Sequence, residues 1–152
     1  MICIQNGTLH TMEEKQETIR ADLLIRDDKI VKISEHISPP EGTRILDASG
    51  LHIYPGLIDA HSHIGISEEK AGRQGDDCNE GTNPVTPCLR AVDAINPMDP
   101  TFRQAVEAGV TCVATGPGSA NVLGGTFMAV KTWGNCVDDM VIKAEVAMKC
   151  AF

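Results

Sequence analysis

The chain has 152 residues and a formal net charge of −8, and 42% of its residues are hydrophobic while 3% are aromatic. This apolar content is sufficient for a packed core. The acidic balance argues against a nucleic-acid-binding surface, which needs clustered Lys and Arg, and it disfavours binding to anionic membranes.

The sequence predicts a cytoplasmic protein. The chain starts with Met-Ile-Cys-Ile-Gln-Asn, which lacks the basic and apolar regions of a secretory signal. No apolar run reaches the roughly 18 residues that cross a membrane. The six cysteines show no paired C-x-x-C spacing, so we expect reduced thiols rather than a zinc module.

Residues 1–54 have the pattern of a module of short strands. The apolar residues 23–25 are followed by Asp27-Asp28-Lys29 and then by the apolar stretch 30–33, which predicts a tight hairpin. The histidines of this module lack ligand partners at metal spacing and are interpreted as ordinary surface or strand residues: His10, His36 and His52.

A strand–helix–strand unit is predicted in the rest of the chain. A strand is expected at 57–63, and a β-branched, apolar run predicts a buried parallel strand at 110–115. Between them, Asp99 and Pro100 form a helix start for residues 100–108, with Asp99 as the N-cap and Pro100 at the first helical position. This order indicates a βαβ unit and therefore an α/β fold.

Three further segments leave alternatives open. The polar stretch 66–99 is either a lid over a site or a solvated acidic loop. The glycine-rich loop containing Gly118 and Ser119 either contacts substrate or makes a tight connection. A short strand is expected at 127–131, whereas 138–149 fits a strand and an amphipathic helix equally.

The residues with the clearest chemistry are His61 and His63. Side chains in a strand alternate between its faces, so both imidazoles are expected on one face, together with Asp59. Two neighbouring imidazoles form half of a site for a divalent metal, most simply zinc. Asp59 is a candidate for orienting one imidazole from behind, or it is a carboxylate that only caps a strand hydrogen bond.

The run 55–65 resembles the signature of the amidohydrolase superfamily, with first-strand metal ligands at His61 and His63. Further segments are similar to the same family: residues 4–9, 21–25, 29–33, 45–50 and 105–111. The resemblance implies an α/β chain in which a small N-terminal β-sandwich module, residues 1–54, precedes a metal-dependent (β/α)8 barrel in residues 55–152. The branch it resembles most is the imidazolonepropionase-like one.

The barrel is expected to be incomplete in this chain, because a whole (β/α)8 barrel needs about 250 residues. The resemblance implies further ligands from later strands: histidines, an aspartate and, in dinuclear members, a bridging lysine or glutamate. No histidine follows His63. Lys131 and Lys143 are candidates for a bridging carboxylated lysine, although lysines mostly face solvent.

Three functions remain open at this level. The first is metal-dependent hydrolysis of a non-peptide carbon–nitrogen bond in a small cyclic amide or amidine, with this chain as the N-terminal portion of the enzyme. The second is a non-catalytic fragment or pseudoenzyme module without a complete metal site. The third is a metal-binding module that combines His61 and His63 with an acidic loop residue. A partial barrel leaves strand edges open, so we expect a homo-oligomer or a self-associating fragment.

Overall fold

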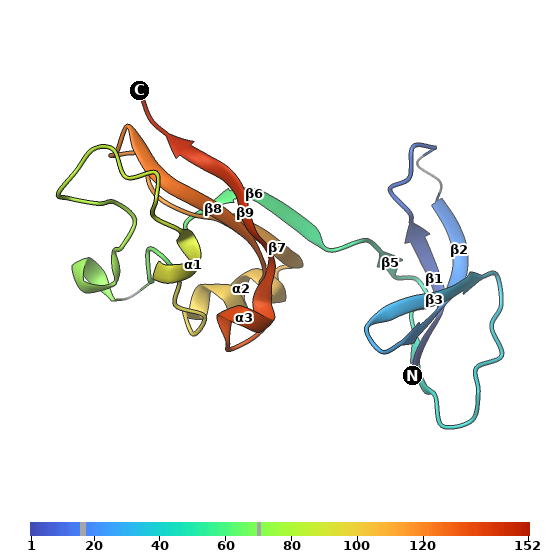
Figure 1. The fold of residues 1–152 in the computed structure, drawn as a ribbon. Helices are drawn as coiled ribbons and strands as arrows, with labels where there is room; N and C mark the ends of the chain where they lie inside the picture. Colours follow the sequence, from blue (N-terminus) through green and yellow to red (C-terminus); the bar gives the residue numbers. More distant parts are fainter. Residues whose placement is uncertain (16–17, 70) are drawn as a thin grey trace. The chain divides into compact units, whose positions relative to one another are not determined.

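The computed structural model describes residues 1–15, 18–69 and 71–152, and these residues form two compact units, Met1–Pro55 and Gly56–Phe152 (Figure 1). Each unit has its own sheet and its own buried clusters. The chain is thus a mixed α/β protein with two sheets. No helix in the described part of the chain is both long and apolar enough to cross a membrane.

The first unit contains a single mixed sheet of five strands. The strands are β1 (Ile2–His10), β2 (Thr18–Arg26), β3 (Lys29–Ser34), β4 (Arg44–Asp47) and β5 (His52–Ile53). Their order is β3-β2-β1-β4, with β5 also paired to β1. The β1–β2 and β2–β3 pairs are antiparallel, whereas β4 and β5 run parallel to β1. The described part of this unit has one sheet, so a two-sheet sandwich stays a prediction.

The predicted hairpin is present between β2 and β3. Its two loop residues, Asp27 and Asp28, have φ angles of 46° and 61°. Two consecutive positive φ angles are the requirement of a type I′ turn, whose twist matches that of the flanking strands. Aspartate tolerates this backbone region better than most residues do, which explains why the pair closes the hairpin.

The second unit contains a four-stranded sheet in the order β6-β7-β8-β9. The strands are β6 (Leu57–Ser62), β7 (Val110–Thr115), β8 (Leu123–Lys131) and β9 (Val141–Cys150). The helix α2 (Pro100–Glu107) joins β6 to the parallel strand β7, which confirms the predicted βαβ unit. By contrast, β8 runs antiparallel to both of its neighbours, which departs from a simple parallel barrel repeat.

Short helical turns lie within the connections of the second unit. The long polar segment after β6 contains η1 (Gly72–Gly75) and α1 (Ala91–Ala94). The ambiguous stretch 138–149 is mostly strand, because β9 begins at Val141, and the preceding α3 (Val137–Met140) is a four-residue turn and not the amphipathic helix of the other alternative. Each of α1 and α3 has only four residues.

The core of the second unit joins one face of the sheet to the helices. Nine buried residues form one cluster: Ile66, Cys78, Ala91, Ile95, Phe102, Val113, Met128, Val130 and Met140. Because residues alternate along β8, Met128 and Val130 point into this cluster while Phe127 points to the other face. The helices therefore cover the face of the sheet that carries Met128 and Val130, and the histidines lie on the opposite face with Phe127.

Candidate metal centre

The two predicted histidines lie together at the carboxyl end of β6. The ring centroids of His61 and His63 are 5.3 Å apart, with the ring planes at 82°. Both rings meet Phe127 of β8 edge-on, at centroid distances of 5.2 Å for His61 and 6.1 Å for His63. Both imidazoles therefore pack against the same apolar ring, that of Phe127.

A hydrogen bond fixes the tautomer of His63. Its Nδ1 lies 2.7 Å from the carbonyl oxygen of Gly116, the residue that follows β7. A carbonyl oxygen can only accept, so Nδ1 carries the proton and Nε2 keeps its lone pair in the neutral ring. A backbone carbonyl that holds the far nitrogen of an imidazole is the usual support of a metal-binding histidine.

The second imidazole is held by a lysine that the sequence did not single out. Nζ of Lys149 lies 3.2 Å from Nε2 of His61 and 5.8 Å from the centroid of Phe127. An ammonium group only donates, so Nε2 of His61 is the acceptor. Lys149 lies on β9 and His61 on β6, the two outer strands of the sheet, so the sheet curls around this face.

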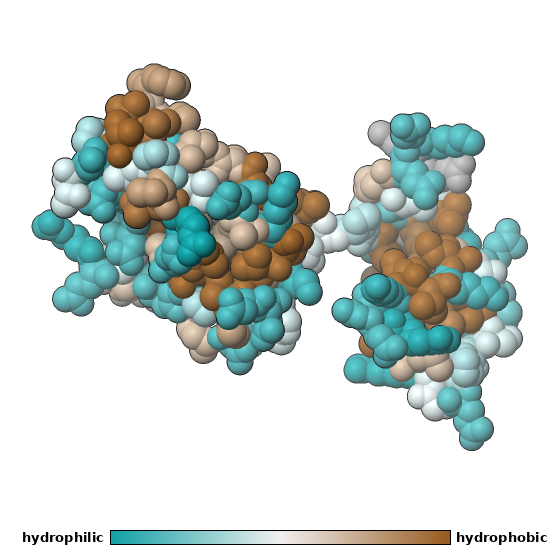
Figure 2. Space-filling view, in the orientation of Figure 1, coloured by the Kyte–Doolittle hydropathy of each residue, from teal (hydrophilic) through white to brown (hydrophobic). Residues whose placement is uncertain are grey.

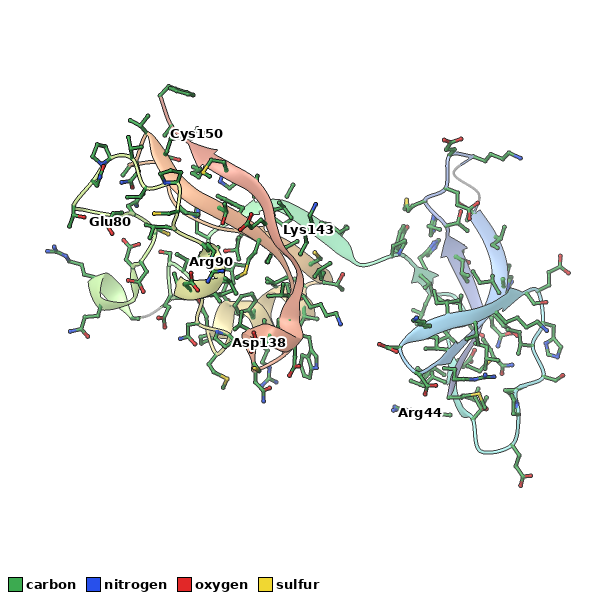
Figure 3. The ribbon with its side chains drawn as sticks, in the orientation of Figure 1. Arg44, Glu80, Arg90, Asp138, Lys143 and Cys150 are labelled. Carbon is green, nitrogen blue, oxygen red and sulfur yellow. The ribbon has the colours of Figure 1, made fainter. Side chains whose placement is uncertain are left out.

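The two lysines proposed from the sequence lie elsewhere. Lys131 and Lys143 are both exposed, as is usual for lysine. Lys143 is labelled in Figure 3 near the start of β9, whereas the carboxyl end of that strand carries Lys149 beside the labelled Cys150. Lys149 could not be chosen from the sequence because the direction of β9 was unknown. Lys149 reaches the histidine end of the sheet only because β9 runs parallel to β6.

Asp59 supports the backbone of the histidine segment. Its exposed carboxylate accepts the main-chain N–H of His61 at 3.0 Å. The β6–β7 register shifts between Asp59 and Ser62, where three steps on β6 face two steps on β7. This bulge interrupts the alternation from which a shared face was predicted. The contact found is thus with the main chain, and an imidazole-orienting role stays a prediction.

The loop after β7 is tied down by the long polar segment. The N–H of Gly118 donates to the carbonyl of Cys78 at 2.7 Å, and the N–H of Ala120 donates to Oδ1 of Asn79 at 3.0 Å. The amide of Gly118 is therefore already used, which favours the tight connection at that residue. Ser119 is exposed, and its contact with substrate stays a prediction.

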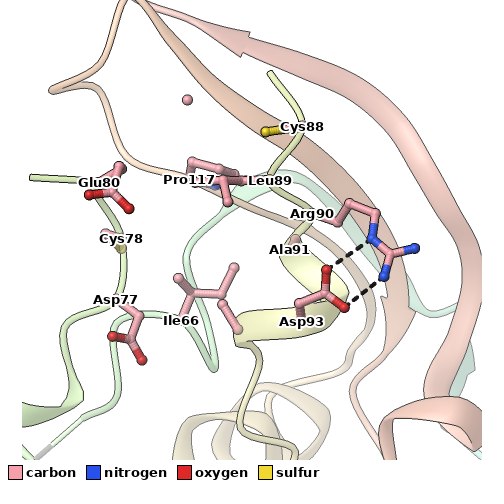
Figure 4. Close-up of a pocket in the computed structure, with 12 residues that line it drawn as sticks. Ile66, Asp77, Cys78, Glu80, Cys88, Leu89, Arg90, Ala91, Asp93 and Pro117 are labelled. Atoms are coloured by element: carbon pink, nitrogen blue, oxygen red, sulfur yellow. Dashed lines mark hydrogen bonds and ion pairs between the residues drawn. The ribbon is translucent and has the colours of Figure 1, made fainter. Parts of the chain in front are cut away.

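A cavity of about 180 Å³ lies where these two loops meet (Figure 4). Its lining includes Ile66, Glu80 and Pro117, together with the ion pair of Arg90 and Asp93. Nη2 of Arg90 lies 2.8 Å from Oδ1 of Asp93, and this hydrogen bond lowers the pKa of the Asp93 carboxyl. Part of the polar stretch thus contacts the β7–β8 loop, while its carboxylates at Glu69, Asp76 and Asp77 are exposed, so both the lid and the solvated acidic loop stay predictions.

The described residues contain no group of three His, Cys, Asp or Glu side chains placed to hold one metal ion. His61 and His63 therefore supply a two-imidazole arrangement here. Their geometry nevertheless fits a cation, since His63 keeps a lone pair on Nε2 and Nε2 of His61 already binds an ammonium group.

Comparisons with known proteins identify the relatives of this chain. No family model matches it. The crystal structure of an amidohydrolase from Thermotoga maritima MSB8 matches with a TM-score of 0.92 and 38% identity, covering 100% of this chain and 39% of that one. Amidohydrolase tasK from Hapsidospora irregularis is 34% identical over 113 residues, which are 72% of this chain and 12% of that protein.

A D-hydantoinase from Ralstonia pickettii is 43% identical over 63 residues, 41% of this chain and 13% of that protein, and dihydroorotases match as well. The chain belongs to the amidohydrolase superfamily. It spans less than half of the Thermotoga amidohydrolase and about an eighth of these two curated relatives. Within the superfamily, the imidazolonepropionase-like branch stays a prediction.

Proposed function

We propose that this chain provides the first-strand part of a metal-dependent hydrolase that cleaves a non-peptide carbon–nitrogen bond in a small cyclic amide. The observation that carries the proposal is the histidine pair, with the far nitrogen of His63 held by the Gly116 carbonyl. D-hydantoinases and dihydroorotases are named for cyclic amide substrates, which supports this class of substrate. The surrounding fold we propose is a (β/α)8 barrel in a cytoplasmic protein.

The metal ligands in this proposal are Nε2 of His61 and Nε2 of His63. The ion, most simply zinc, would activate a water molecule and polarise the substrate carbonyl. His63 is prepared for this role by its fixed tautomer, and the buried Phe127 ring restricts both imidazoles. Since β6, β7 and β9 bring their carboxyl ends to the same side, substrate would approach from that end of the sheet.

Lys149 is the third group that we place in this centre. A charged ammonium beside Nε2 of His61 would repel a divalent cation. A neutral amine that attacks carbon dioxide forms an N–C bond, releases one proton and becomes a carbamate, whose anionic oxygens are metal ligands. This reaction would turn the ammonium group beside His61 into a ligand, in the position that Lys131 and Lys143 do not reach.

The alternative is a non-catalytic module. It is favoured by one observation, that the described residues lack a third His, Cys, Asp or Glu at the pair. Catalytic zinc sites hold the ion with three protein ligands and keep one position for water. Binding without turnover would therefore distinguish this alternative from the hydrolase.

The test is a titration of the full chain with Zn²⁺, followed through the imidazole nitrogen resonances of each histidine. We expect Zn²⁺ to shift Nε2 of His61 and His63, and His61→Ala to weaken the effect on His63 at least about 10-fold. His36→Ala is the control, because its side chain is 81% exposed in the other unit. Unmoved His61 and His63 resonances at saturating Zn²⁺ would refute the metal centre.

Two added measurements complete this test. Release of the ring-opened product from hydantoin in the presence of Zn²⁺ would support the hydrolase, and binding without it would favour the non-catalytic module. With ¹³C-bicarbonate, a carbamate resonance should be present in the chain and in Lys143→Arg but absent from Lys149→Arg. A resonance that survives Lys149→Arg would exclude the assigned lysine.

A further inference from the structure

A second imidazole pair lies in the first unit. Nε2 of His10, at the end of β1, lies 2.7 Å from Nδ1 of His52 in β5. The hydroxyl of Thr18 in β2 lies 3.3 Å from the other nitrogen of His10. Tyr54 stacks on the His10 ring, with centroids 4.1 Å apart and planes at 6°.

The backbone of three strands fixes this arrangement. His10 is paired with Thr18 across the antiparallel β1–β2 ladder. His52 is paired with Thr8 across the parallel β1–β5 ladder, so the two histidines come from adjacent strands of one sheet. The pair therefore does not depend on a loop, and local spacing could not predict it, because the two residues lie 42 positions apart.

The facing nitrogens of the two rings share one hydrogen bond, in which one nitrogen carries the proton and the other presents its lone pair. A neutral imidazole has one protonated and one unprotonated nitrogen. If His10 carries its proton on Nδ1, facing Thr18 Oγ1, and His52 carries its proton on Nε2, then both facing nitrogens present lone pairs. Oγ1 of Thr18 can accept the Nδ1–H of His10 and so stabilise that tautomer. Metal-binding imidazoles commonly donate their other N–H to an acceptor in this way.

We propose that Nε2 of His10 and Nδ1 of His52 form a site for a divalent transition-metal ion that prefers imidazole, such as Zn²⁺, Ni²⁺ or Cu²⁺. Imidazole nitrogen suits these ions, whereas Mg²⁺ and Ca²⁺ take oxygen ligands. Water fills the remaining coordination positions, since His52 is exposed and His10 only half-buried. Stacking on Tyr54 keeps the His10 ring in its plane when the ion binds.

The experiment uses the full chain with His61→Ala and His63→Ala, which removes the other histidine pair and leaves the first unit unchanged. Zn²⁺ is added while the imidazole resonances of His10, His36 and His52 are recorded. We expect shifts at His10 and His52 but not at His36. His52→Gln should weaken Zn²⁺ binding at least about 10-fold, and Thr18→Val should weaken it by a smaller factor.

His52→Gln also removes the side-chain contact between β5 and His10, which could itself disturb the first unit. The resonance shifts of the chain that keeps both His10 and His52 therefore serve as the independent readout. Mg²⁺ at the same concentrations is the matched control and should leave both rings unshifted. The proposal is overturned if Zn²⁺ leaves the His10 and His52 resonances in place, or if His52→Gln binds Zn²⁺ as tightly as its parent.

Discussion

Gly116 allows the close packing around the histidine pair because glycine has no side chain. Its carbonyl accepts Nδ1–H of His63 at 2.7 Å, and the residue itself is buried beside β8. A Cβ added at this position would overlap the ring of Phe127, the same ring that supports both imidazoles. Only glycine lets the carbonyl and the aromatic ring occupy their present places.

Gly116→Ala should therefore destabilise the second unit by about 1–3 kcal/mol, the usual cost of overpacking a core. It should also displace the His63 ring, because Phe127 must move away from the new methyl group. Urea unfolding gives the free energy, and the Nδ1–H proton resonance of His63 reports the ring. Gly81→Ala is the matched control, since Gly81 is exposed and has nothing within 4 Å of an added Cβ. Equal stability of the two variants would contradict this account.

At this scale, the juxtaposition of His61 and His63 could be predicted from the sequence, but the residues that hold their rings could not. The spacing of His61 and His63 is visible because strand alternation is local. The link between His61 and Lys149 depends on the curl of a four-stranded sheet, and 88 residues separate the two. The bulge after Asp59 also depends on the neighbouring strand, so alternation alone could not predict it.

Strand β2 carries a buried charge that ties two other segments to it. Asp22 is 3% exposed, and its two carboxylate oxygens accept the N–H groups of Asn6 at 2.9 Å and Ile37 at 2.8 Å. Burial alone would raise the pKa of this carboxyl, but the two main-chain donors and the nearby His36 outweigh burial and hold its pKa below the ordinary value. Ionised Asp22 is thus part of the folded first unit.

The sign of the pH dependence follows from that lowered pKa. Asp22 stabilises the first unit above the unfolded carboxyl pKa of about 3.9, and the contribution is lost as the pH falls through the folded pKa. Asp22→Asn should therefore be less stable than the parent chain at pH 7, by an amount that shrinks below about pH 4. Hydrogen exchange of the β2 amides, corrected for intrinsic rates, measures this difference.

Asp28→Asn provides the control for this experiment, because Asp28 is an exposed turn residue at φ 61° and asparagine accepts that conformation. It should leave the exchange of β2 nearly unchanged at every pH. A stability difference for Asp22→Asn that stays constant from neutral to acid pH would show that the charge is not the stabilising feature.

Elements were predictable where their signals are local. The helix α2 follows Asp99, which is 2% exposed and whose Oδ1 accepts the N–H of Thr101 at 2.9 Å, so the predicted cap is confirmed. Its other oxygen accepts the N–H of Gly65 at 3.2 Å, which joins the helix start to the turn after His63. The direction of β8 was not predictable, because an apolar run buries equally well in either direction.

The whole molecule exposes apolar side chains on the outer strands of the second unit. Within the described part of the chain, β6 pairs only with β7 and β9 pairs only with β8, so each has an open edge. Leu57 and Ile58 on β6 are 62% and 73% exposed, and Ile142 on β9 is 55% exposed. Figure 2 shows apolar surface over the strands of this unit. Open strand edges with apolar flanks pair readily with other chains.

Two opposing forces decide whether copies of the chain associate. The open edges and apolar side chains favour association, whereas a net charge of −8 on every copy opposes it. Added salt screens that repulsion, since the Debye length falls from about 30 Å at 0.01 M to about 3 Å at 1 M. We therefore expect self-association that strengthens with salt, which is the opposite of an assembly held by ion pairs.

Sedimentation equilibrium over a salt series measures this balance. Ile58→Lys should shift the chain toward monomer, because it places a charge on the exposed edge strand β6. Leu51→Lys is the matched control: Leu51 is 59% exposed but lies outside the strands, in the first unit, so the same added charge should change association little. A chain that stays monomeric at high concentration and high salt would show that the open edges of β6 and β9 do not recruit another copy.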